Sequence, residues 1–410
     1  MPRIRLLVSI LLAFHLAALV WVAWGLPIGP HEAQLYFEGE GVVSHLMHLG
    51  RWMLPDADFL NIRLPFLLIH LVNLALFYRL SRILLRDETA VYTSFVLFLL
   101  LPGIVSSAVL ATTTGLILVV YQGFLVLYLQ KKEWLAYLLL PLFLLIDRSC
   151  VILYFALLTY ALWRREVKLL AVTGVLFAAS LGIYGVDMHG KPVNYFVDTV
   201  ALYAAIFSPL LFLYFFYAIY RILFKGEKNI IWHVSFTVLL LSLAISMRQR
   251  IPIQDFAPYV IVAIPLMVRL FFRSYRVRLP RFRRHYRALA GLVVGVLVLN
   301  TLILLFHRPL FAVLENPKKH FAAPFYLPYW CAEALKEKGI DSVTVGKKSY
   351  AYQLRYYGIE PGGPKLRNAP CPGCESVTIR YNGRILTRCY VSKINNRNEI
   401  ALNRVDQSEK

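Results

Sequence analysis

Apolar runs long enough to cross a membrane recur along most of this chain, and they limit the fold more than any other feature. The first run covers residues 6–26 behind Arg3 and Arg5, and about 20 apolar residues suffice for a spanning helix. It lacks the small-residue cleavage pattern of a signal peptide, so we interpret it as a retained helix. The further apolar segments are 64–85, 90–108, 113–130, 134–147, 149–163, 168–186, 200–223, 230–247, 256–272 and 288–306.

The composition agrees with a membrane environment. Hydrophobic residues make up 59% of the 410 positions and charged residues only 16%, with a mean hydropathy of +0.59. A soluble core cannot bury that much apolar surface. The predicted fold class is therefore an α-helical polytopic membrane protein with about eleven transmembrane helices. The segment 134–147 is short, so the sequence leaves three alternatives for it: a tilted helix, a re-entrant helix, or a helix merged with its neighbour.

Basic residues give the predicted orientation. They follow the even-numbered spans, as Arg79, Arg82, Arg86, Lys131, Lys132, Arg164, Arg165, Lys168, Arg221, Lys225, Lys228 and the cluster 269–287. The positive-inside rule places these loops and the N-terminus in the cytoplasm. The odd-numbered loops and the C-terminal tail are then extracytoplasmic, in what we expect to be a bacterial inner membrane. The net charge of +21 is explained by this topology and by contact with membrane lipid, and it indicates no nucleic-acid partner.

Residues 307–410 differ in composition from the preceding 1–306, and they predict a small extracytoplasmic α/β domain. Helices are expected in "YLPYWCAEALKEKGI" and "SYAYQLRYYGI", and strands in "DSVTVG", "ESVTIRY" and "RILTRCYVSK". The segment "EPGGPK" is expected to be a Pro/Gly turn. The domain division is thus 1–306 for the membrane domain, with a long first extracytoplasmic loop at about 27–62, and 307–410 for the tail.

Four of the five cysteines lie in the tail: Cys331, Cys371, Cys374 and Cys389. An even number in an oxidising compartment favours disulfides, and four cysteines allow three pairings. The spacing Cys-Pro-Gly-Cys also fits a zinc pair or a redox pair. No histidine or helix start beside it marks a reactive thiolate, so disulfides are the favoured interpretation.

Unusual polar residues gather in the predicted extracytoplasmic loops. They are Glu32 in "IGPHEAQLYFEGEG", Asp147 with Arg148, the segment 187–198, and the segment 247–255. Ionisable groups at a membrane boundary are costly unless they meet water, a partner or a substrate. One such residue at a helix end is commonly only a solvated or snorkelling group. Their concentration on one face predicts a site there.

The order of these motifs resembles the GT-C superfamily of membrane glycosyltransferases. The closer likeness is to its branch of protein O-mannosyltransferases and lipid A aminoarabinose transferases. It rests on the acidic motif after the first span, "IRLPFLLIHLVNLALFYRLSRILL", "LPGIVSSAVLATTTGLILVVYQGFLVLYL", the basic residue at span six and "RQRIPIQDFAPYVIVAIPLMV". Together these motifs cover most of residues 1–306.

The resemblance implies transfer of a sugar, hexose or pentose, from a polyprenyl-phosphate donor to a glycan, lipid or protein acceptor at the extracytoplasmic face. Such chemistry needs a carboxylate to take the acceptor's proton and cations to neutralise the departing phosphate. Glu32 matches the second position of the family's Asp-Glu pair, with His31 beside it as a second catalytic candidate. The predicted substrate-binding residues are Tyr36, Arg63, Arg148, Arg248, Arg250, Gln254 and Tyr259, with Arg148 and Arg248 the first choices for the phosphate. No organic cofactor is implied, and a divalent metal is left open.

Two departures from the family pattern keep alternatives open. His31 stands where the family has Asp, and Thr112–Thr114 stand where it has Pro-Asp. His31 is then expected to share proton handling or metal binding with Glu32, or the site has lost activity. His31, His45 and His48 with Glu38 or Glu40 match no standard metal spacing. The alternative function is a non-catalytic envelope-assembly protein, a carrier or scaffold. A transporter is disfavoured because the sequence shows no internal repeat.

Overall fold

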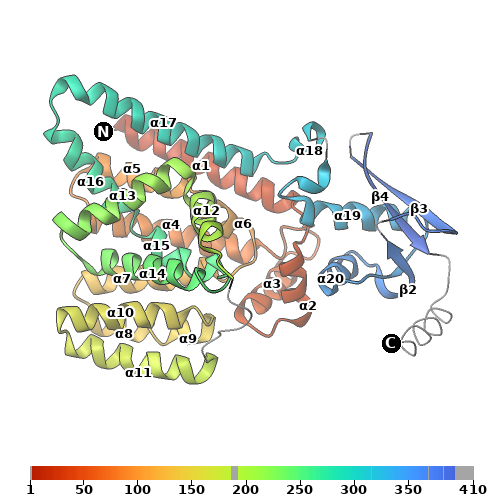
Figure 1. Cartoon of the computed structure of the whole chain (residues 1–410), viewed down its shortest axis with the longest axis horizontal. Helices are drawn as coiled ribbons and strands as arrows, with labels where there is room; N and C mark the ends of the chain where they lie inside the picture. Colours follow the sequence, from red (N-terminus) through yellow and green to blue (C-terminus); the bar gives the residue numbers. More distant parts are fainter. Residues whose placement is uncertain (1, 186–192, 315, 368, 382, 393–410) are drawn as a thin grey trace. The chain divides into compact units, whose positions relative to one another are not determined.

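The apolar segments of the sequence form helices in the structure, a computed structural model that describes residues 2–185, 193–314, 316–367, 369–381 and 383–392 (Figure 1). The chain divides into two compact units. Unit 1 comprises residues 1–21 and 63–305, and unit 2 comprises residues 22–62 and 306–410. The long first loop therefore groups with the C-terminal tail rather than with the helical bundle, which the sequence did not indicate.

Unit 1 is a helical bundle whose core is lined by large apolar and aromatic side chains. Its helices are α1 (Pro2–Gly25, whose last turn belongs to unit 2), α4 (Leu64–Leu84), α5 (Glu88–Leu100), α6 (Pro102–Val109), α7 (Thr114–Leu129), α8 (Glu133–Leu139), α9 (Leu142–Ile146), α10 (Cys150–Arg164), α11 (Val167–Tyr184), α12 (Phe196–Phe207), α13 (Pro209–Lys225), α14 (Ile230–Ser246), η1 (Ile253–Asp255), α15 (Ala257–Ile261), α16 (Ile264–Val277) and α17 (Pro280–Leu305).

Five helices are long and apolar enough to cross a membrane: Arg3–Gly25, Leu64–Leu84, Val167–Tyr184, Ala257–Val277 and Pro280–Leu305. The bent pairs α5–α6 and α12–α13 raise the number to as many as seven, if each is one span. Shorter apolar helices occupy the remaining predicted segments. These counts refer to the described residues.

Proline explains where the apolar segments break. The α5–α6 pair bends by 57° at Pro102, and the α12–α13 pair bends by 105° at Pro209. Proline has no backbone N–H to donate and fits the first turn of a helix, so each marks a new start. The short segment 134–147 is likewise divided into α8 and α9 around Pro141. A division into two short helices was not among the outcomes predicted for this segment.

Unit 2 joins two helices of the first loop to the mixed α/β tail. Its elements are α2 (Pro30–Glu38), α3 (Val42–Met53), α18 (Leu310–Val313), η2 (Pro317–Lys319), α19 (Ala323–Lys336), β1 (Ser342–Thr344), α20 (Lys348–Tyr356), β2 (Glu360–Arg367), β3 (Cys374–Tyr381) and β4 (Arg384–Ser392). The sheet order is β1-β2-β4-β3, with β1 parallel to β2 and the other pairs antiparallel. α19 packs on β3, and α20 packs on α2.

The prediction of a turn in "EPGGPK" is wrong, because this segment is most of β2. Local preference opposes a strand here, since Pro and Gly are depleted in strands. The pairing explains the outcome. Val343 of β1 lies opposite Pro361, and the register then shifts before Thr344 pairs with Lys365, so the irregular part is accommodated as a bulge. Leu366 and Arg367 then pair regularly with β4.

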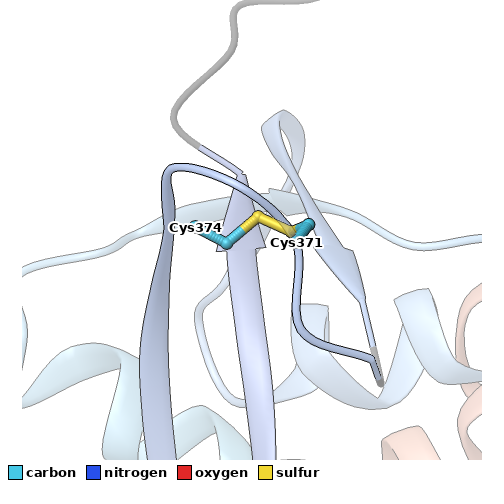
Figure 2. Close-up of a disulfide and its surroundings, with 2 residues drawn as sticks. All are labelled: Cys371 and Cys374. Atoms are coloured by element: carbon cyan, nitrogen blue, oxygen red, sulfur yellow. A yellow bond between two sulfur atoms is a disulfide. The ribbon is translucent and has the colours of Figure 1, made fainter.

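The tail contains one disulfide among its described residues, between Cys371 and Cys374 in the turn before β3 (Figure 2). This confirms the prediction of a disulfide for two of the four candidate cysteines of the tail. Cys331 and Cys389 remain thiols in the tail core, with their sulfur atoms 3.9 Å apart. A hydrogen bond to Cys389, together with burial, raises the pKa of the Cys331 thiol, so it is not a reactive thiolate.

Candidate active site

Glu32 lies in the first turn of α2, behind Gly29 and Pro30. Its carboxylate accepts a hydrogen bond of 2.8 Å from the Gly29 backbone N–H, and the side chain is only 3% exposed. This is the acidic half of a capping box, which satisfies a backbone donor before the helix begins. Glu32 therefore has a structural role at the start of α2 in addition to any chemical one.

The two neighbours predicted to assist Glu32 differ in their surroundings. His31 is exposed. The Tyr36 hydroxyl accepts a hydrogen bond of 2.8 Å from Arg51, and its ring packs against His48 and Tyr356, at centroid distances of 4.3 and 5.4 Å. Tyr36 therefore belongs to an aromatic cluster built by α2, α3 and α20.

The tail holds the Glu32 segment in place within unit 2. The Ile28 backbone N–H donates to the Tyr357 hydroxyl at 3.0 Å, and the Gln353 amide donates to the Ile28 carbonyl at 2.8 Å. The Tyr352 hydroxyl also donates to the Glu38 carboxylate. None of these tail residues was predicted to belong to the site, because the contacts join positions more than 300 residues apart.

The histidines of the first loop do not form a metal site. His45 and His48 each place a ring nitrogen on a backbone carbonyl, of Gly41 at 2.9 Å and Tyr36 at 3.1 Å. Among the residues that the structure describes, no three His, Cys, Asp or Glu side chains lie close enough to share a metal ion.

In unit 1, Arg148 meets a buried carboxylate. Its Nε lies 3.7 Å from an oxygen of Asp255, which is 4% exposed at the end of η1. Burial, with a smaller contribution from the negative charge of Asp147, raises the Asp255 pKa to about 7, and Arg148 opposes this rise. The neighbouring Asp147 carboxylate accepts from the Arg148 backbone N–H and from the Thr113 hydroxyl, at 2.7 and 3.3 Å.

This contact brings together two regions that the sequence predicted separately. Asp147–Ser149 precedes α10, whereas Asp255 belongs to the segment that leads into α15. Ser149 makes a second link, because its carbonyl accepts a hydrogen bond of 3.3 Å from the Tyr259 hydroxyl. Asp255, Thr113 and Ser149 were not named as site residues. A carboxylate in an otherwise apolar segment was the available signal for Asp255.

The remaining predicted residues occupy different environments. Arg248, Arg250 and Gln254 are exposed around the loop after α14, and the Arg248 carbonyl accepts from the Val193 backbone N–H at 3.0 Å. Tyr259 is fully buried, with its ring edge-on to Tyr121. Arg63 is fully buried at the N-cap of α4. Their roles toward a substrate stay predictions. Glu32, His31 and Tyr36 belong to unit 2, and the predicted arginines belong to unit 1.

Comparison with known proteins gives a match in structure alone. No family model matches the sequence, and no curated protein matches it. Two crystal structures of ArnT from Cupriavidus metallidurans are similar in fold. The apo structure has a TM-score of 0.52 at 12% identity, covering 94% of this chain and 98% of that one. The structure with undecaprenyl phosphate has a TM-score of 0.53 at 12% identity, covering 95% and 98%. The chain therefore has the fold seen in these ArnT structures.

Proposed function

We propose that this protein is an integral membrane glycosyltransferase that moves a sugar from a polyprenyl-phosphate donor to a glycan, lipid or protein at the extracytoplasmic face. The observation that carries the proposal is a fold likeness over nearly the whole chain to ArnT, one of whose structures holds undecaprenyl phosphate. The likeness extends over the tail as well as the helical bundle, since it covers 95% of this chain. Unit 2 would then be the extracytoplasmic part.

In the proposed reaction, Glu32 and the arginines have different roles. The acceptor oxygen bonds to the anomeric carbon of the sugar, the bond from that carbon to the phosphate oxygen breaks, and the acceptor's proton passes to a carboxylate. We assign the proton to Glu32. We assign the departing phosphate to Arg148, assisted by Arg248, because a guanidinium can donate two hydrogen bonds to phosphate oxygens.

The charge state of Asp255 determines how strongly this carboxyl group holds the Arg148 guanidinium. With its pKa near 7, the buried carboxyl is partly neutral at physiological pH, so it competes weakly with a phosphate for the guanidinium. A fully ionised partner would hold Arg148 more strongly. This contact supports Arg148 as a phosphate-binding residue more than any other predicted arginine.

The test is Glu32→Gln in purified protein reconstituted with a polyprenyl-phosphate-linked sugar and membrane-lipid acceptors. Gln can still accept the Gly29 N–H bond, so α2 should keep its start while the proton acceptor is lost. We expect transfer to fall by about 100-fold or more. The matched control is Glu40→Gln, which removes an exposed acid from the same loop and should leave transfer within about twofold. Transfer by Glu32→Gln at the wild-type rate would exclude Glu32 as the base.

One observation favours a second candidate, a non-catalytic carrier or scaffold of envelope assembly. Glu32 already caps α2, and the acid that the family carries before it is His31 here. Such a protein would bind the lipid-linked donor without turning it over. Donor binding by wild type with no sugar transfer to any acceptor fraction of the envelope would favour this alternative.

A further inference from the structure

A cationic cavity of about 440 Å³ lies in unit 1 where α13 and α16 end. It is lined by five basic residues and one acidic residue, namely Arg221, Lys225, Arg269, Arg273, Arg278 and Glu227. An adjoining cavity of about 350 Å³ shares Arg269, Arg273 and Glu227 and adds the loop between α4 and α5. The labels of α5, α13 and α16 lie at one end of the bundle (Figure 1). The basic pattern of the sequence predicts this end to be cytoplasmic.

Several of these basic side chains are held in place by neutral partners. Arg221 donates to the Tyr217 hydroxyl at 2.9 Å and to the Ser274 hydroxyl at 3.4 Å. Arg278 lies 4.3 Å above the Tyr286 ring, and Arg269 donates to the Leu84 carbonyl. These contacts fix the positions of the guanidinium groups without neutralising their charge.

Positive charge in the cavity exceeds the negative charge available to balance it. Arg269 and Arg273 are four residues apart on α16, so the two like charges face the same side of the helix. Within the described part of the chain, neither the Lys225 side chain nor the Arg273 side chain has a hydrogen bond or an ion pair. The Asp87 carboxylate pairs with Arg276. An anion bound among these side chains would relieve the repulsion.

Simpler explanations account for part of this pattern. Basic residues in a cytoplasmic loop stop translocation, and basic residues in the last turn of a helix interact well with its dipole. Basic side chains spread around the rim of a helical bundle would meet both of these requirements. Neither requires residues from α13 and α16 to converge on one cavity with a single carboxylate in it.

We propose that this cavity binds a phosphate group, as the head group of an anionic membrane lipid. Guanidinium groups match the geometry of phosphate oxygens, and basic pockets between helices on the cytoplasmic side suit anionic head groups. The apolar part of the lining, Ile222, Leu266 and Leu270, offers a surface for the start of an acyl chain. A soluble phosphate has the same chemistry as the head group, but it has no apolar part that could contact these apolar side chains. The proposal does not depend on the transferase reaction.

The test measures binding of short-chain lipids to the full-length protein in a neutral detergent. The probes are dioctanoyl phosphatidylglycerol, dioctanoyl phosphatidylcholine and inorganic phosphate. The variant Lys225→Gln/Arg273→Gln removes the two cations without partners. The matched control Arg284→Gln/Arg287→Gln removes two exposed charges from α17 that do not line either cavity.

We expect wild type to bind the anionic lipid at least about tenfold more tightly than the zwitterionic one. The cavity variant should lose about tenfold or more of that affinity, and the control should change by less than about twofold. Equal losses in both variants would mean that bulk charge, not the cavity, attracts the lipid. Inorganic phosphate binding as tightly as the lipid would assign the site to a soluble anion. If the double variant is not monodisperse, Lys225→Gln alone is compared with Arg287→Gln, and the lipid selectivity of wild type alone can overturn the proposal.

Discussion

At the scale of single residues, Arg148 is the group whose contacts best fit a role at the donor phosphate. Its side chain is half exposed and 3.7 Å from Asp255. We expect Arg148→Ala to weaken binding of a polyprenyl-phosphate donor by about 10- to 100-fold, the worth of one charged hydrogen-bonding pair. Acceptor binding should change little. Titration calorimetry with donor and acceptor analogues measures donor binding and acceptor binding separately. Arg284→Ala is the control for the loss of a positive charge. A loss confined to expression yield would make Arg148 a structural anchor.

Asp255 predicts how stability depends on pH. Burial raises its pKa from 3.8 to about 7, so the folded protein binds its proton more tightly than the unfolded chain. The stabilisation is complete below pH 3.8 and is lost as pH rises through about 7. We expect the melting temperature of wild type to fall between pH 5 and pH 8 more steeply than that of Asp255→Asn, which has no proton to lose. Parallel slopes for the two proteins in detergent melts would contradict this assignment.

At the scale of secondary structure, the break between α5 and α6 depends on a side chain from α17. The buried Thr301 hydroxyl lies within hydrogen-bond distance of two carbonyls, that of Leu297 in its own helix and that of Leu100, just before Pro102 interrupts the helical hydrogen bonds. A carbonyl left without a donor in an apolar interior is costly. We expect Thr301→Val to lower stability by about 1–3 kcal/mol, seen as a lower melting temperature in detergent. Thr301→Ser keeps the hydroxyl and should melt close to wild type. Equal losses in both variants would point to packing instead.

At the scale of the whole molecule, the tail disulfide and the basic loops make a joint prediction about orientation. Cys371 and Cys374 form their disulfide in a turn at the surface of the tail, as expected in an oxidising compartment. In intact spheroplasts, mild reductant with a membrane-impermeant maleimide should therefore label the tail. A cysteine placed in the basic loop before α8, as Lys132→Cys, should react only after permeabilisation. Labelling of the tail only after permeabilisation would reverse the proposed orientation.

The sequence by itself determined the features that depend on local pattern. Apolar runs identified the helical segments, because a helix that is buried or that faces lipid requires apolar residues throughout its length. Alternation and β-branched residues identified β3 and β4. The order of motifs was sufficient to predict a fold like that of the lipid A aminoarabinose transferases, and the structural likeness to ArnT agrees with this prediction.

The tertiary structure decided what depends on contacts between distant positions. The Pro/Gly segment of β2 is part of a strand because β1 pairs with it, while β4 pairs with the residues that follow it. The ion pair of Arg148 with Asp255 follows from how elements far apart in sequence pack. The first loop joins the tail through Ile28, Gln353 and Tyr357. Local pattern fixes which residues need burial or hydrogen bonds, but the partner that satisfies each need is set by the packing of the whole chain.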